Sequence, residues 1–207
     1  MSNKVIVLFV EGPTEIEFYK AVIKRAHDLM NVPFECTVEY ADMKGIGNYK
    51  KDALRKFNKI KEKYKENKEF YIFLCIDSDV FELSKKPPIN KQEIHSELQS
   101  AGAKSVSDIV ARQSIEDWFL IDLQGVLSYL RLPSKTKRPR GRGQESLKKL
   151  FNSASKVYVK GGKTEGFIKK LNIDKIMQSC CKSLYPLCKE IGFDCSLVCK
   201  HKNRLDG

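Results

Sequence analysis

The chain lacks a hydrophobic run long enough to cross a membrane. None of its apolar stretches reaches the roughly 18–20 residues that a membrane helix requires, so no membrane partner is expected. The apolar run at residues 5–10 ends at Glu11 and predicts a buried strand rather than a signal peptide, which favours a cytoplasmic protein. A phosphate loop of the form G-x-x-x-x-G-K-[ST] is also missing, so the chain carries no sequence signature of an ATPase.

Patterns typical of zinc sites and of nucleophilic hydrolases are missing as well. The seven cysteines include no C-x-x-C pair, so those near the C-terminus are expected to be small core residues rather than zinc ligands. An odd number of cysteines without a secretion signal predicts free thiols. No G-x-S-x-G elbow is present, which argues against hydrolysis through a serine nucleophile.

Positive charge is abundant and unevenly placed. The 207 residues carry a formal net charge of +12, and residues 134–163 hold ten basic residues against one glutamate. The stretch at 133–143 has no apolar residue beyond its prolines and predicts an exposed loop. Such a loop suits sequence-independent contacts to nucleic-acid phosphates, although it could simply be solvated, and without aromatic residues it does not indicate base stacking. The candidate nucleic-acid-binding residues are Lys135, Lys137, Arg138, Arg140 and Arg142.

Strand and helix patterns alternate along the first half of the chain. Strands are expected at residues 4–10, 34–43, 70–76 and, more weakly, 105–111, and helices at 14–30, 49–64, 90–100 and 115–130. Thr14 and Glu17 predict a capping box at the first helix. This order predicts an α/β, Rossmann-like fold with a mainly parallel four-stranded sheet flanked by helices. Residues 133–207 are expected to add the basic loop, a short strand near 157–160 and helices at 144–151, 164–171 and 174–191, packed on the domain of residues 1–132.

Acidic residues follow two of the expected strands. Glu11 and Glu15 come after the first strand, and Asp77 and Asp79 come after the third. In α/β sheets, ligands bind beyond the carboxyl ends of the strands, so these carboxylates are expected to converge, with Asp77 and Asp79 on one side of extended chain. Crowded carboxylates without histidine or thiolate favour Mg²⁺ or Mn²⁺. The alternatives are that Glu15 complements the helix dipole and that the two aspartates cap a turn.

Two of these sequence motifs resemble those of a known family. V-I-V-L-F-V-E-G-P-T-E, followed about sixty residues later by F-Y-I-F-L-C-I-D-S-D, is similar to the Toprim domain of topoisomerases, DnaG-type primases and OLD-family nucleases. Glu11, Asp77 and Asp79 fill the places of that family's glutamate and D-x-D motif. The E-G-P-T-E form is more similar to the OLD and small stand-alone anti-phage nucleases. The resemblance spans roughly residues 4–122 and, more weakly, 157–171. The missing glycine of D-x-D-x-x-G argues against strand passage or primer synthesis.

The resemblance implies further site residues and partners. In the related nucleases a glutamate in an S-x-E-x-W context joins the site, and S-I-E-D-W at residues 114–118 places Glu116 there. A lysine near residue 160 neutralises the phosphate in relatives, which makes Lys160 the candidate here. Because OLD proteins fuse the nuclease to an ATPase and this chain has none, the resemblance implies a separately encoded ATPase partner in anti-phage defence.

These expectations combine into a Mg²⁺- or Mn²⁺-dependent nuclease acting on DNA or RNA. Asp77 and Asp79 would bind the principal ion with Glu11, which could instead accept a proton from the attacking water. Glu15 and Glu116 could hold a second ion. An exposed stretch in the C-terminal half could also form a homodimer. The main alternative is a non-catalytic Toprim-like module that binds nucleic acid or an ATPase, and a weaker one is phosphotransfer on nucleotides.

Overall fold

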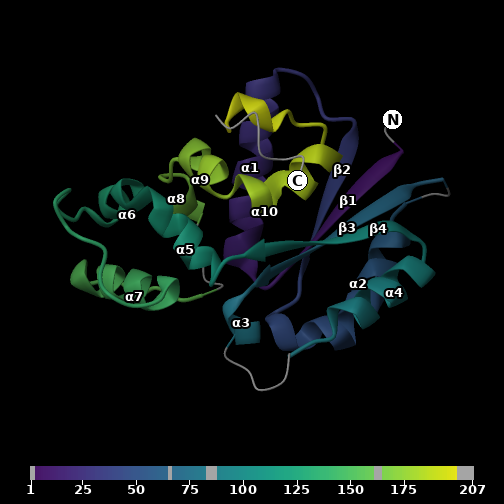
Figure 1. Ribbon diagram of the computed structural model, residues 1–207, viewed down its shortest axis with the longest axis horizontal. Coiled ribbons are helices and arrows are strands. Elements are labelled where there is room, and N and C mark those ends of the chain that lie inside the picture. The colour runs from purple at the N-terminus through teal and green to yellow at the C-terminus, as the bar shows by residue number, and fades with distance from the viewer. Residues whose placement is uncertain (1–2, 65–66, 83–87, 161–164, 200–207) are drawn as a thin grey trace.

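A four-stranded parallel sheet lies at the centre of the computed structural model, which describes residues 3–64, 67–82, 88–160 and 165–199 (Figure 1). The predicted α/β fold, with a parallel sheet flanked by helices, is confirmed. The last strand, for which the sequence signal is the weakest, is nine residues long and pairs with its neighbour over most of its length. In the spatial order β2-β1-β3-β4, the strands are β1 (Lys4–Val10), β2 (Cys36–Asp42), β3 (Glu69–Asp77) and β4 (Ala103–Ala111).

Helices cover both faces of the sheet because its central strands are apolar on both sides. Residues 5–10 of β1 are fully buried, and alternate residues point to opposite faces. The even-numbered residues pack with α1 (Pro13–Met30) and α10 (Cys181–Glu190), whereas the odd-numbered residues pack with α2 (Tyr49–Lys61) and α4 (Lys91–Ser100). Figure 1 shows α2 and α4 on one side of the sheet and α1 with α10 on the other.

The order of the strands creates a crevice at the carboxyl ends of β1 and β3. These two strands are parallel neighbours, paired from Lys4 with Glu69 to Phe9 with Leu74. The helix that follows β1 packs on one face of the sheet, and the helix that follows β3 packs on the other. The segments that follow β1 and β3 therefore diverge as they leave the sheet. Open α/β folds bind ligands at such a point of divergence.

The region after β4 shares one hydrophobic core with the sheet. Phe119, for example, contacts Phe18 of α1 and Phe167, with ring centroids 5.6 Å apart in both pairs. No helix among the described residues is long and apolar enough to span a membrane. The remaining elements are η1 (Ile46–Asn48), α3 (Asp79–Glu82), α5 (Ile115–Phe119), η2 (Leu120–Asp122), α6 (Leu123–Leu130), α7 (Gly143–Ser153), α8 (Glu165–Ile168), α9 (Ile173–Ser179) and η3 (Cys195–Leu197).

Several predicted boundaries are wrong. The helix expected at 115–130 tightens into a 3-10 turn at Leu120–Asp122, where the Asp122 carboxylate accepts a hydrogen bond of 2.8 Å from Asn172 N–H. The helix expected at 174–191 is divided at Cys180. Residues 157–160 form no strand, and the side chains of Tyr158 and Lys160 contact carboxylates of the site; residues 161–164 lie outside the described part.

The capping box predicted for α1 does not form. The helix begins at Pro13, and its N-cap is Gly12, which supplies no side-chain oxygen. Thr14 is therefore already inside the first turn and cannot act as the cap. The carboxylate of Glu15 instead accepts a hydrogen bond from the Glu11 backbone N–H at 2.9 Å, which folds the start of the helix back onto the end of β1.

Two cysteines also differ from expectation. Cys181 and Cys199 form a disulfide, so the prediction of seven free thiols is wrong for this pair. The chain reverses direction after α10, which brings the two Cα atoms to 6.7 Å although 18 residues separate them in sequence. The free cysteines among the described residues are Cys36, Cys75, Cys180, Cys188 and Cys195.

Gly143 allows α7 to pack directly on α5. Its N–H donates to the Asp117 carboxylate at 3.2 Å, and a Cβ at this position would overlap both that carboxylate and the Asp117 backbone nitrogen. Gly143→Ala is therefore expected to lower the free energy of unfolding by about 2 kcal/mol. Urea denaturation measures the effect. Gly47→Ala, where no atom lies within 4 Å of an added Cβ, is the control, and equal losses of stability in both variants would contradict the packing argument.

Candidate metal centre

Three buried carboxylates meet in the crevice between β1 and β3. Glu11 directly follows β1, Glu15 lies in the first turn of α1, and Asp77 is the last residue of β3. Each offers a ligand oxygen, and these oxygens lie within 4.8 Å of one another. The three residues are 8%, 4% and 2% exposed, respectively. Parallel pairing of β1 and β3 brings Glu11 beside Asp77, whose backbone N–H donates to Glu11 Oε1 at 3.3 Å.

Lys160 supplies a positive charge to this cluster. Its Nζ lies 2.8 Å from Asp77 Oδ2 and 3.6 Å from Glu11 Oε2. The other Asp77 oxygen accepts a hydrogen bond of 2.8 Å from Ile115 N–H, at the start of α5. Asp77 is therefore fixed from two sides, by a lysine that follows α7 and by the backbone of α5.

The acidic charge exceeds what Lys160 can balance. Burial raises the pKa of Asp77 from 3.8 to about 7, because the charge of Lys160 opposes the shift only in part and the charge of Glu11 adds to it. Burial also raises the pKa of Glu11 and, well above its usual value, that of Glu15. Burial alone would lower the pKa of Lys160, but the charges of Asp77, Glu11 and Glu116 raise it above its ordinary value.

Glu116, which lies outside the group of three mutually close carboxylates, is a further buried carboxylate with an unsatisfied oxygen. The residue is 0% exposed, and its charge contributes to the raised pKa of Asp77. Glu116 Oε1 accepts a hydrogen bond of 3.0 Å from the Tyr158 hydroxyl, whereas Oε2 has no hydrogen-bond partner among the described residues. A buried acceptor without a partner costs free energy. An oxygen-only ligand set with excess negative charge fits a hard divalent cation such as Mg²⁺ or Mn²⁺.

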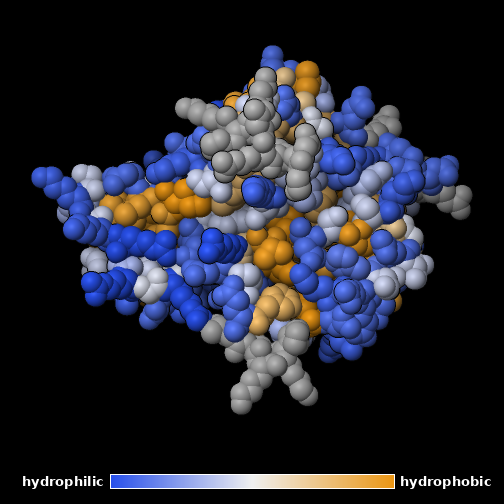
Figure 2. Space-filling view, in the orientation of Figure 1, coloured by the Kyte–Doolittle hydropathy of each residue, from blue (hydrophilic) through white to orange (hydrophobic). Residues whose placement is uncertain are grey.

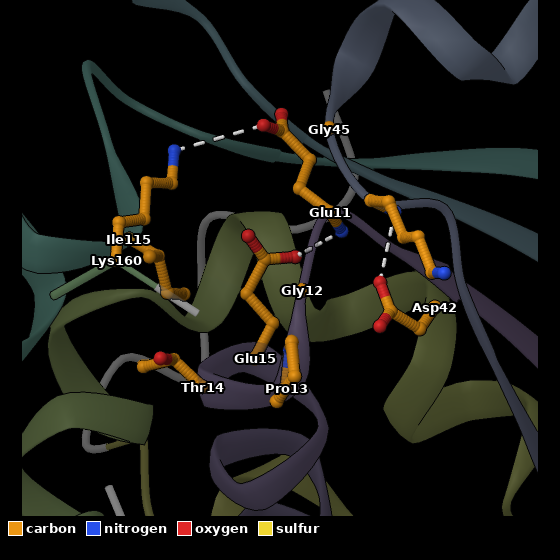
Figure 3. Close-up of a pocket in the computed structure, with 10 residues that line it drawn as sticks. Glu11, Gly12, Pro13, Thr14, Glu15, Asp42, Gly45, Ile115 and Lys160 are labelled. Carbon is orange, nitrogen blue, oxygen red and sulfur yellow. Dashed lines mark hydrogen bonds and ion pairs between the residues drawn. The ribbon is translucent and has the colours of Figure 1, made fainter. Parts of the chain in front are cut away.

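A cavity of about 400 Å³ opens beside the carboxylates. Figure 3 shows Glu11 and Glu15 on its wall, with the Lys160 amine reaching toward the Glu11 carboxylate. The amino terminus of α1 also lines the cavity, and its N-cap provides no side-chain acceptor. The positive end of an 18-residue helix favours an anion such as phosphate.

The glycine turn after β2 forms another part of the cavity wall. Gly45 adopts φ +102°, a conformation that favours glycine, and its N–H donates to the Glu11 carbonyl at 2.8 Å. That amide is therefore already used. Lys44 is exposed and lines the same cavity.

Asp79 lies outside the set of mutually close carboxylates. The chain turns at Ser78, so Asp79 begins α3 instead of continuing the strand. The prediction that Asp77 and Asp79 share one side of extended chain is therefore wrong. Asp79 is half-buried, and its negative charge still raises the pKa of Glu11, so its proposed part in metal binding stays a prediction.

The basic loop is exposed, as predicted, and it is attached to α5. Arg138 forms an ion pair of 2.6 Å with Asp117, whose other oxygen accepts hydrogen bonds from Ser114 and Gly143. Figure 2 shows strongly hydrophilic side chains gathered over α7. Four loop cations form no ion pair with any residue that the structure describes: Lys135, Lys137, Arg140 and Arg142.

Sequence reasoning missed two residues, Tyr158 and Asp117. Tyr158 precedes Lys160 by two positions, and the alternation V-Y-V-K could have placed both side chains on one side. For Asp117 the sequence indicates only a favourable charge in the first turn of a helix. Its role in holding the loop depends on the Gly143 contact, which no local pattern reveals.

The buried charge predicts that stability and metal binding oppose each other. The pKa of Glu15, ordinarily 4.5, is raised by burial in the folded, metal-free protein. The free energy of unfolding should therefore fall as the pH rises above about 4.5. Glu15→Gln keeps an acceptor for Glu11 N–H but removes the charge. It is expected to raise the unfolding free energy at pH 8 by about 1–2 kcal/mol and to flatten its pH dependence.

Urea denaturation in EDTA at pH 5 and pH 8 measures both effects. Glu17→Gln is the matched control, because Glu17 lies on the same helix but only half-buried, 3.3 Å from Lys20. It should show no gain in stability at pH 8. A loss of stability in Glu15→Gln at pH 8 would contradict the proposed charge excess.

The motif resemblance has no independent support from relatives. The chain matches no protein-family model, no curated protein and no solved structure. Membership of the Toprim family therefore stays a prediction from Glu11, Asp77 and their positions at the strand ends.

Proposed function

We propose that the protein is a Mg²⁺- or Mn²⁺-dependent nuclease that hydrolyses phosphodiester bonds in DNA or RNA. One observation carries this proposal: three buried carboxylates from different parts of the chain lie within reach of one cation, a single lysine contacts two of them, and a fourth buried carboxylate has an oxygen without a partner among the described residues. Such an arrangement is costly unless a cation completes it. The carboxylates are Glu11, Glu15, Asp77 and Glu116.

The residues around the cavity suit hydrolysis of a phosphodiester. Glu11, Glu15 and Asp77 would hold one divalent ion, and Glu116 would hold a second. A bound Mg²⁺ would supply Lewis acidity at the scissile phosphate. Glu11, whose pKa burial raises, would accept a proton from the attacking water. Lys160 and the amino terminus of α1 would stabilise negative charge on the phosphate.

The basic loop would hold the nucleic acid. Its unpaired cations are exposed, and the Asp117–Arg138 ion pair attaches the loop to the helix that carries Glu116. Phosphate contacts of this kind do not read base sequence. A role in anti-phage defence, with a separate ATPase and as a homodimer, is part of the proposal and rests only on the motif resemblance.

Replacing Asp77 tests catalysis. Removing a residue that only orients a metal ligand lowers metal affinity or activity by about 10–100-fold. Because Asp77 would bind the ion directly, Asp77→Asn is expected to lower Mg²⁺-dependent cleavage by at least this factor. Binding of nucleic acid should persist. Cleavage is measured on plasmid DNA, tRNA and mRNA with Mg²⁺ or Mn²⁺, and binding by fluorescence anisotropy in EDTA.

Asp108→Asn is the matched control for this experiment. Asp108 is a half-buried aspartate of β4 that pairs with Lys91 and His95 away from the crevice, so its replacement should leave cleavage unchanged. If the wild type leaves every substrate intact, alone and with the ATPase encoded nearest to it, the catalytic proposal fails. Retained binding would then favour the non-catalytic module.

The loop predicts a measurable salt dependence of binding. Lys135→Gln/Lys137→Gln is expected to weaken nucleic-acid binding and to lower the slope of log K against log salt by about two, because each lysine would neutralise one phosphate. Anisotropy titrations between 50 and 200 mM salt, about the range over which such binding weakens, measure the slope. Lys51→Gln/Lys59→Gln, which removes two exposed lysines of α2, should leave it unchanged. Equal slopes for all three proteins would exclude the loop as the binding surface.

A further inference from the structure

The segment after α7 places two side chains on the carboxylates. Residues 156–159 form neither helix nor strand, and Tyr158 is the buried residue among them. Val157 and Val159 are 79% and 59% exposed, whereas Tyr158 is 4% exposed. Tyr158 contacts Glu116, and Lys160, two positions later, contacts Asp77. These two contacts give the segment one hydroxyl and one amine that reach the carboxylates.

The Tyr158 ring is held in place independently of its hydroxyl. It packs edge-on against Phe151 of α7, with ring centroids 5.2 Å apart. The hydroxyl donates to Glu116 Oε1 at 3.0 Å. Phenylalanine would keep the ring packing and remove only the donor.

The backbone of Glu116 is fixed relative to Asp77, but its carboxylate needs a separate restraint. Ile115 N–H, one residue earlier, holds Asp77 Oδ1 at 2.8 Å, which ties the first turn of α5 to the end of β3. Among the described residues the Tyr158 hydroxyl is the hydrogen-bond donor to the Glu116 carboxylate, and it occupies one oxygen. The other oxygen, Oε2, has no hydrogen-bond partner among the described residues, and the charge of Glu116 contributes to the raised pKa of Asp77.

We propose that Tyr158 is a positioning residue, which fixes Glu116 Oε1 so that Oε2 can bind a second divalent ion beside Asp77. This inference rests on the proposed metal-dependent function. Ligands in metal sites are commonly oriented by an outer-shell hydrogen bond, and removing such a partner typically lowers metal affinity by about 10–100-fold. Tyr158 fills that place here, with a neutral donor that leaves the negative charge on Glu116.

The test is Mn²⁺ binding to wild type and to Tyr158→Phe, measured by isothermal titration calorimetry and by the electron paramagnetic resonance signal of free Mn²⁺. Wild type is expected to bind two ions. Tyr158→Phe should bind the weaker ion about 10-fold less tightly and the tighter one unchanged. Tyr71→Phe is the matched control, since Tyr71 donates to Glu69 at 3.0 Å at the opposite end of β3. It should leave both affinities unchanged.

A double-mutant cycle with Glu116→Gln separates positioning from a structural role. If Tyr158 acts through Glu116, adding Tyr158→Phe to Glu116→Gln has no further effect on the weaker ion. Additive reductions in affinity, or equal weakening of both ions, would overturn the proposal. Unchanged affinities in Tyr158→Phe, or a wild type that binds one ion only, would overturn it and leave the nuclease proposal standing. A wild type that binds no Mn²⁺ would overturn both.

Discussion

The repulsion among buried carboxylates is the constraint on which this site depends. Glu11, Glu15, Asp77 and Glu116 are nearly inaccessible to water, and Lys160 is their nearby countercharge. Water cannot screen these charges as it would at the surface, so each raises the cost of ionising the others. The fold tolerates this cost because the apolar packing on both faces of the sheet fixes the strand ends. The site is thus a strained place in an otherwise regular structure.

The parallel sheet explains why residues far apart in sequence meet. Sixty-six positions separate Glu11 from Asp77, yet adjacent parallel strands bring their carboxyl ends together. The same crevice receives the start of α1, which adds Glu15 and a positive helix end. It also receives α5, whose first N–H fixes Asp77. The carboxylates of the site therefore come from places where an element begins or ends, whereas Lys160 and Tyr158 come from the irregular segment after α7.

Much of the fold could be predicted from the sequence because buried parallel strands are continuous apolar runs. The apolar runs ending at Val10 and Ile76 locate β1 and β3, and the acidic residues Glu11 and Asp77 that follow them indicate the site. The wrong predictions depend on contacts that local pattern cannot show. Asp79 leaves the extended chain because the backbone turns at Ser78. Cys181 and Cys199 meet only because the chain reverses after α10. Tyr158 acquires its partner from an element forty-two positions away.

The first turn of α5 connects the carboxylate cluster to the basic loop. Three consecutive residues face three different structures: Ile115 holds Asp77, Glu116 contacts Tyr158, and Asp117 holds Arg138 of the basic loop. Under the proposed function, this one helical turn would set the distance between the carboxylates and the phosphates bound by the loop. Substitutions in the loop could then change its contacts without moving the carboxylates, whereas a residue inserted into this turn would displace Asp117 and the loop relative to Asp77.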